Sequence, residues 1–179
     1  SRLWELNDSN SDDAIANNIG HVLGKPVIVP VRSSSGSVSW KAIFGNGYNS
    51  RNGRAVLFVV DIISGKVTMI PAQESGVTGG NGLGNLVVID RWGGTDLTNQ
   101  SRDGYADTVY AADQQGAIWK FDLRNVTANP AATTTLTAVT TPFFVAADDS
   151  GRRQPILGGL QVAAGSGGGV MVYFGTGGF

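Results

Sequence analysis

The chain has 179 residues with no cysteine, a formal net charge of −1, 26 glycines and only 15% charged residues. This near-neutral charge offers no electrostatic footprint for nucleic acid or an anionic membrane surface, and the lack of cysteine excludes disulfides, thiol nucleophiles and cysteine-ligated zinc. No apolar run approaches the roughly 20 residues of a membrane-spanning helix. The length suits one domain, and abundant glycine with few charges is typical of many short strands joined by tight turns.

Apolar residues follow the two-residue period of β-strands along most of the chain. Only the window 12–21 favours a helix, with Asp12 and Asp13 placed to cap its first turn. The alternation and the β-branched clusters predict eleven strands. They cover residues 2–6, 26–32, 38–45, 55–62, 66–71, 85–91, 107–112, 117–123, 143–147, 157–163 and 170–174.

Similar segments recur along the chain, which is the pattern of a repeat architecture. Trp4-Glu5-Leu6-Asn7 resembles Trp119-Lys120-Phe121-Asp122, and this recurrence predicts that both tryptophans pack between repeats. Three other segments share an apolar strand that ends in aspartate and a tight turn that closes on glycine, where a positive φ is easily adopted. These segments are 59–65, 111–116 and 146–151.

The repeats predict an all-β fold, a partial β-propeller with quinoprotein-like blades of antiparallel strands. Residues 26–71 are expected to form one blade, 85–123 most of a second, and 155–174 the start of another. Trp4 would belong to a preceding blade, which gives an arc of about three to four blades. We therefore expect residues 1–179 to be one segment of a longer propeller, cut from a larger protein, whose open faces meet partner chains.

The loop 99–107 has the spacing of a cation site, with oxygen ligands at positions 1, 3, 5, 7 and 9 and glycine at position 6. The predicted ligands are Asn99, Ser101, Asp103, the carbonyl of Tyr105, and Asp107. Asp103 and Asp107 are the only carboxylates among them, so we expect modest Ca²⁺ affinity, with Asp90 or Asp96 as a possible further ligand. The alternative is a polar surface loop whose aspartates cap turns.

The sequence gives little support for a catalytic site or a phosphate-binding loop. His21 is the only histidine, and no Gly-x-Ser-x-Gly elbow is present, so a hydrolase triad is not expected. Asp148 and Asp149 are adjacent and are predicted to cap a turn rather than to act as paired catalytic carboxylates. The glycine-rich segments 79–84 and 165–169 precede strands rather than helices, which favours flexible connectors over a phosphate-binding loop.

Several segments, in the same order, closely resemble the carboxy-terminal propeller of the PilY1/PilC family of type IV pilus biogenesis factors and tip adhesins. They are 44–50 (Phe-Gly-Asn-Gly-Tyr-Asn-Ser), 55–61 with Ser64-Gly65, 81–83, 103–107 with the hairpin after it, and 174–177. The resemblance implies a calcium loop of the form Asp-x-Asn/Asp-x-Asp-Gly-x-x-Asp. Its match is direct at Asp103, Gly104 and Asp107, and weaker at Asn99 and Ser101.

The family strand usually runs directly into the first aspartate of this loop. Here Asp90 ends the strand thirteen residues before Asp103, so the resemblance implies an insertion over 91–98. Either Asn99 has replaced the first ligand, or the insertion bulges outward and Asp90 still coordinates.

The resemblance further implies a non-catalytic, calcium-binding propeller that is exported and located at the cell surface or pilus tip, in association with the outer membrane. Its expected partners are minor pilins or other tip proteins and a host-cell or surface receptor. Its expected roles are control of pilus extension and retraction, twitching motility and adhesion. Two alternatives stay open: a quinoprotein-type propeller enzyme, since 61–65 matches the Asp-x-x-Ser/Thr-Gly turn of those repeats, and a generic propeller assembly scaffold.

Overall fold

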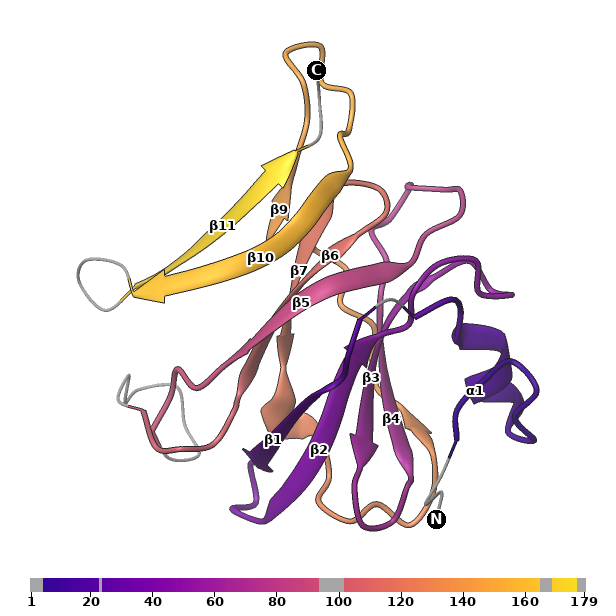
Figure 1. The fold of residues 1–179 in the computed structure, drawn as a ribbon, viewed down its shortest axis with the longest axis vertical. Helices are drawn as coiled ribbons and strands as arrows, with labels where there is room; N and C mark the ends of the chain where they lie inside the picture. The colour runs from indigo at the N-terminus through magenta and orange to yellow at the C-terminus, as the bar shows by residue number, and fades with distance from the viewer. Residues whose placement is uncertain (1–4, 23, 94–101, 165–168, 177–179) are drawn as a thin grey trace.

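The computed structural model describes residues 5–22, 24–93, 102–164 and 169–176, and the regular secondary structure of these residues is almost entirely β-strand (Figure 1). Up to residue 93 the chain forms α1 (Asp13–Asn18), β1 (Val27–Arg32), β2 (Val38–Gly45), β3 (Ala55–Asp61), β4 (Val67–Ala72) and β5 (Leu83–Ile89). From residue 102 onward it forms β6 (Thr108–Asp113), β7 (Ala117–Asp122), the 3₁₀ turn η1 (Leu123–Asn125), β8 (Thr134–Thr135), β9 (Phe144–Val145), β10 (Ile156–Ala164) and β11 (Val170–Thr176).

The strands form three sheets that follow one another along the chain. In the first blade, β1-β2-β3-β4 are antiparallel neighbours, and β8 adds a short parallel strand to β4. The second blade has the order β5-β6-β7-β9, and β10-β11 form a separate hairpin. The predicted blades over 26–71 and 85–123 and the start of a third after 155 are therefore confirmed. The second blade begins slightly earlier than predicted, at Leu83.

Apolar side chains fill the space between consecutive sheets, as in a stack of propeller blades. The largest core joins the first and second blades, with Ile43 and Leu57 on one side and Trp119 and Phe121 on the other, all at most 1% exposed. A second core joins the far face of the second blade, including Tyr110, to β10 and β11. The prediction that Trp119 packs between blades is confirmed.

The face of the first blade away from the second blade is covered by α1, which lies in the predicted helical window 12–21 and confirms it. Most of the predicted strand at 2–6, including Trp4, lies outside the described residues, and Glu5 and Leu6 are not in a strand. The helix begins after Asp12, whose carboxylate accepts the Ala14 amide at 2.9 Å. Ile15 and Ile19 pack against the sheet, which fixes the helix on this face of the first blade.

The segment Gly45-Asn46-Gly47 joins the helix, the first blade and the second blade. Asn46 is fully buried, and its side-chain oxygen accepts the amides of Val56 and Leu83 at 3.0 and 2.9 Å. Its side-chain nitrogen donates to the carbonyls of Asn18 and Arg54. A buried amide with all of these bonds satisfied fixes one geometry, because any rearrangement would leave polar groups unpaired.

The predicted flexible connector at 79–84 is closely packed at its centre. A Cβ atom placed on Gly82 would lie 2.0 Å from the carbonyl oxygen of Gly47, so this backbone approach requires glycine. The segment 165–168, which forms most of the other predicted connector, lies outside the described residues.

The chain after β7 returns to the first blade and is fixed there by a buried ion pair. Lys41 and Asp61 are each 1% exposed, with 3.0 Å between Nζ and the carboxylate. Lys41 also donates to the Thr127 carbonyl at 2.9 Å, and the amide of Asn129 donates to Asp61 at 3.2 Å. These bonds, with the pairing of β8 on β4, couple the two blades outside their shared core.

Candidate cation-binding loop

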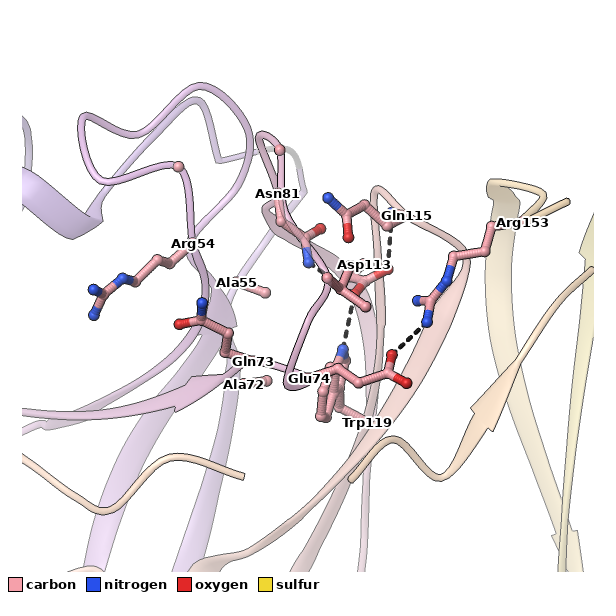
Figure 2. Close-up of a pocket in the computed structure, with 13 residues that line it drawn as sticks. Arg54, Ala55, Ala72, Gln73, Glu74, Asn81, Asp113, Gln115, Trp119 and Arg153 are labelled. Carbon is pink, nitrogen blue, oxygen red and sulfur yellow. Dashed lines mark hydrogen bonds and ion pairs between the residues drawn. The ribbon is translucent and has the colours of Figure 1, made fainter. Parts of the chain in front are cut away.

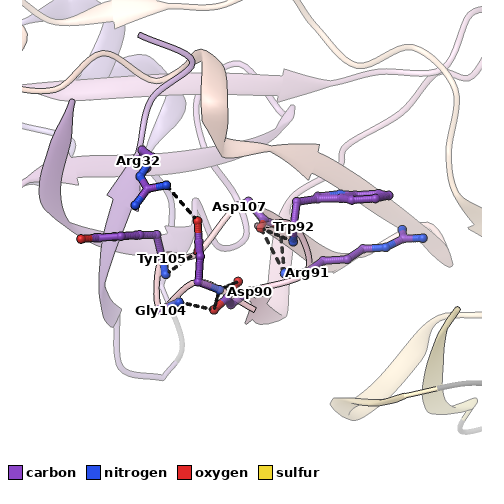
Figure 3. Close-up of polar contacts among 8 residues, drawn as sticks. Arg32, Asp90, Arg91, Trp92, Gly104, Tyr105 and Asp107 are labelled. Atoms are coloured by element: carbon purple, nitrogen blue, oxygen red, sulfur yellow. Dashed lines mark hydrogen bonds and ion pairs between the residues drawn. The ribbon is translucent and has the colours of Figure 1, made fainter. Parts of the chain in front are cut away.

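The loop between β5 and β6 lies against the end of β1, at the junction of the two blades (Figure 3). The Ala106 amide donates to the Pro30 carbonyl at 2.9 Å, and Ala106 forms a parallel bridge with Val31. The loop therefore belongs to the second blade in sequence while its backbone is bonded to the first blade. Residues 94–101 lie outside the described part of it.

Asp90 closes the described part of the loop. Its carboxylate accepts the amide of Asp103 at 3.1 Å and the amide of Gly104 at 2.7 Å, as Figure 3 shows for Gly104. Gly104 has φ of +88°, which a residue with a side chain rarely adopts. Asp90, left open as a further ligand in the sequence, is thus brought to the predicted loop, whereas Asp96 lies outside the described residues.

Asp103 forms an ion pair with Arg32, a contact that the sequence did not predict. One of its carboxylate oxygens accepts the Tyr105 amide at 3.0 Å, and the other lies 3.2 Å from Nη1 of Arg32. The guanidinium of Arg32 also stacks on the Tyr105 ring, 4.3 Å from its centroid (Figure 3). Arg32 ends β1, and a contact across 71 residues of sequence leaves no local pattern by which it could be found.

Asp107 is only 6% exposed and is hydrogen-bonded to the other side of the loop. Its carboxylate accepts the amides of Arg91 and Trp92 at 3.1 and 2.8 Å and the Thr108 hydroxyl at 2.7 Å. Burial raises the pKa of Asp107, the nearby charge of Asp90 raises it further, and these hydrogen bonds offset the effect only in part. A positive charge at this position would therefore stabilise the ionised carboxylate.

Three of the five predicted ligands fall within the described residues, since Asn99 and Ser101 lie outside them. Asp103 and Tyr105 are adjacent, whereas Asp107 is directed to the Arg91–Trp92 backbone. Among the residues described, no three histidine, cysteine, aspartate or glutamate side chains are gathered into a group that could hold a metal. Carboxylate and carbonyl oxygens are the ligands that Ca²⁺ prefers, so the donor types at Asp103, Tyr105 and Asp107 are compatible with this ion.

A small pocket of about 40 Å³ lies between the blades at the other end of their strands (Figure 2). Asp113 in its wall accepts the Trp119 indole N–H at 2.8 Å and the Asn81 amide at 2.9 Å. An ion pair between Glu74 and Arg153 crosses the rim. The bond between Asp113 and Trp119 stabilises the second blade, to which both belong, whereas the Glu74–Arg153 pair joins the segment after β4 to the segment before β10.

The remaining sequence candidates also serve structure in the part of the chain that is described. Asp148 accepts the amides of Ser150 and Arg152, each at 2.9 Å, so the predicted turn cap is confirmed there. His21 forms a backbone bridge with Tyr48. No helix among the residues described is long and apolar enough to cross a membrane.

The sheets, their shared cores and the junction loop define a segment of a β-propeller. The chain belongs to the PilY1 β-propeller family, since the family model described as "PilY1 beta-propeller domain" matches residues 3–179. It is 41% identical, over 98% of its length, to a type IV pilus biogenesis factor PilY1 homolog of Xylella fastidiosa. It is 32% identical, over 86% of its length, to type IV pilus biogenesis factor PilY1 of Pseudomonas aeruginosa strain UCBPP-PA14.

A solved structure supports the same fold. The crystal structure of the Pseudomonas aeruginosa PilY1 C-terminal domain matches 90% of this chain with a TM-score of 0.65 and 28% identity. The chain spans only 33% of that domain, and 11% and 13% of the two relatives.

Proposed function

We propose that this chain is a non-catalytic propeller segment of a type IV pilus biogenesis factor. The observation that carries the proposal is the family match across residues 3–179, together with relatives that are named as such factors. In this role the segment would act at the cell surface or pilus tip, where it would contact minor pilins and a surface receptor. It would contribute to pilus extension and retraction, twitching motility and adhesion.

The β5–β6 loop would make this role responsive to Ca²⁺. The ligands would be Asp103, the Tyr105 carbonyl and Asp107, with Asp90 or Asn99 at the first position and Ser101 completing the set. Support comes from the oxygen donor set and from Asp90, whose carboxylate binds the same backbone turn that carries Asp103. An ion held there would supply positive charge to a loop rich in carboxylates.

Calorimetric titration of the purified chain with Ca²⁺, after treatment with a chelator, tests the ion. We expect binding by the unmodified chain and its loss in Asp103→Ala and Asp107→Ala. Asp148→Ala is the matched control, because it removes an aspartate that caps a distant turn. An unmodified chain that takes up no Ca²⁺ would remove the ion from the proposal.

The pilus role is tested separately in a bacterium that lacks its own PilY1-type factor. The gene is restored with this segment in place of the equivalent propeller segment, and surface pili and twitching zones are then measured. We expect both to return with the intact segment. A chimaera that is stable and exported but restores neither would contradict the pilus role.

A further inference from the structure

We propose that Arg32 is a built-in competitor of the divalent ion for the carboxylate of Asp103. The guanidinium lies against the Asp103 carboxylate, and an ion bound to the same carboxylate would weaken this contact. The inference rests on the proposed calcium function and adds to it a residue of the first blade that sets the affinity of the site. Arg32 lies outside the 99–107 loop from which the ligands come.

The position of Arg32 is fixed by a strand rather than by a flexible loop. It is the last residue of β1 and pairs in register with Val38 of β2. Two residues earlier, the Pro30 carbonyl accepts the Ala106 amide, which holds β1 beside the loop. The guanidinium is held from one side by the Tyr105 ring and lies 3.2 Å from the Asp103 carboxylate.

The ion pair between Arg32 and Asp103 is shielded enough from solvent to affect the binding of Ca²⁺. The Arg32 and Asp103 side chains are 27% and 16% exposed, so solvent screens their attraction less than it screens a pair at the open surface. The Asp90 carboxylate binds the amides of Asp103 and Gly104, so its negative charge lies beside the same turn. Removal of the guanidinium would leave this turn without the positive charge of Arg32.

An ion and a guanidinium cannot share Asp103 without cost. Ca²⁺ binds carboxylate oxygens at about 2.3–2.6 Å, so its charge would lie next to that of Arg32. The ion therefore weakens the ion pair, and by linkage the ion pair weakens ion binding by the same factor. Because Arg32 belongs to the first blade and the ligands to the second, occupancy of the loop changes a contact between blades.

The decisive comparison is the Ca²⁺ dissociation constant of the unmodified chain with those of Arg32→Gln and Arg32→Lys. We expect Arg32→Gln to bind about tenfold more tightly, since the competing charge is gone. Arg32→Lys should lie between the two, because it keeps the charge but loses the planar fork and the stacking on Tyr105. Circular dichroism checks that each variant is folded.

Arg54→Gln is the matched control. Arg54 is exposed and directly precedes β3, at the opposite end of the sheet from Arg32, because β1 and β3 run in the same direction on either side of β2. This control lowers the net charge by the same amount and should leave Ca²⁺ affinity unchanged. An equal gain in Arg54→Gln would attribute the effect to net charge and overturn competition at Asp103.

A double-mutant cycle locates the effect at Asp103. In an Asp103→Asn background, Arg32→Gln should no longer tighten Ca²⁺ binding, because the contested charge is absent. With a chelator present, hydrogen exchange of the Ala106 amide should be faster in Arg32→Gln than in the unmodified chain. This second readout needs no ion and reports whether Arg32 holds the empty loop against β1.

The outcomes separate the two proposals. If the unmodified chain binds no Ca²⁺, the proposed calcium function fails and competition fails with it. If the unmodified chain binds Ca²⁺ and Arg32→Gln binds with equal affinity, only the competition is overturned. Weaker binding by Arg32→Gln would also overturn it, because Arg32 would then position Asp103 for the ion rather than compete for it.

Discussion

Replacement of Lys41 by methionine tests whether the buried ion pair between β2 and β3 of the first blade stabilises the fold. Methionine retains most of the aliphatic stem but removes the ammonium that binds Asp61 and the Thr127 carbonyl. Asp61 would keep the amides of Ile63 and Ser64 as donors, at 3.1 and 2.8 Å, but would lose its neutralising charge. The result is a buried carboxylate without a counter-ion.

The expected cost is about 3–5 kcal/mol of the free energy of unfolding, the usual range for removing one partner of a buried pair. For a chain of this size, that corresponds to a fall in Tm of about 6–20 °C. The double variant Lys41→Met with Asp61→Asn should recover a large part of the loss. It removes the stranded charge, and the asparagine oxygen can still accept the Ser64 amide.

Urea unfolding followed by circular dichroism measures these differences, with Arg152→Met as the control. Arg152 pairs with Asp148 at the surface, with its own side chain 81% exposed, so its loss should not shift the midpoint measurably. A Lys41→Met chain as stable as the unmodified one would refute the reasoning. A double variant less stable than Lys41→Met would also refute it, because the unpaired charge of Asp61 would then not be the cause of the lost stability.

The same pair predicts a pH dependence with a defined sign. Burial alone would raise the pKa of Asp61, but the Ser64 amide and Lys41 outweigh it, so the pKa lies below its ordinary value of 3.8. The stabilisation is therefore present above about pH 3.8 and is lost as the pH falls through the lowered pKa. The stability difference between the unmodified chain and Lys41→Met should shrink as the pH falls below about 3.8, and a constant difference would contradict the assignment.

Three further changes give separate tests by urea unfolding. Trp119→Phe removes the indole N–H that donates to buried Asp113 and should cost about 1–3 kcal/mol, whereas an unchanged midpoint would mean that the bond contributes nothing. Gly82→Ala places a methyl group 2.0 Å from the Gly47 carbonyl oxygen and should also cost about 1–3 kcal/mol, or the close approach is not required. Asp107→Asn removes a charge that burial disfavours, so at pH 7 with a chelator it should not destabilise the chain, although it should abolish stabilisation by added Ca²⁺.

The hairpins of this fold could be predicted from sequence because their determinants are local. In the second blade, Asp113 accepts the amides of Gln115 and Ala117, and Gly116 adopts φ of +84°. The aspartate, the turn and the glycine lie within five residues of one another. A repeated local signal of this kind fixes the strand pairs, and repeated strand pairs predict blades.

The missed features all join residues that are distant in sequence. The parallel strand β8 on β4, the contact of Lys41 with Thr127 and the ion pair of Arg32 with Asp103 connect segments more than 60 residues apart. Such contacts depend on how the blades stack, and the sequence contains no periodic pattern from which the stacking could be predicted. The helix α1 differs in that its cap was visible, but its packing on the first blade was not.

The location of the loop explains how one ion could influence more than its own ligands. The Asp107 backbone is part of the second blade, since its amide donates to Ile89 at 3.0 Å and its carbonyl accepts from Leu123 at 2.9 Å. Two residues earlier, Tyr105 lies under Arg32 of the first blade. An ion bound to the Asp103 carboxylate would therefore weaken an arginine contact across the blade junction. Ion occupancy would then change how firmly the blades are joined at this end of their strands, whereas the apolar core between them would stay the same.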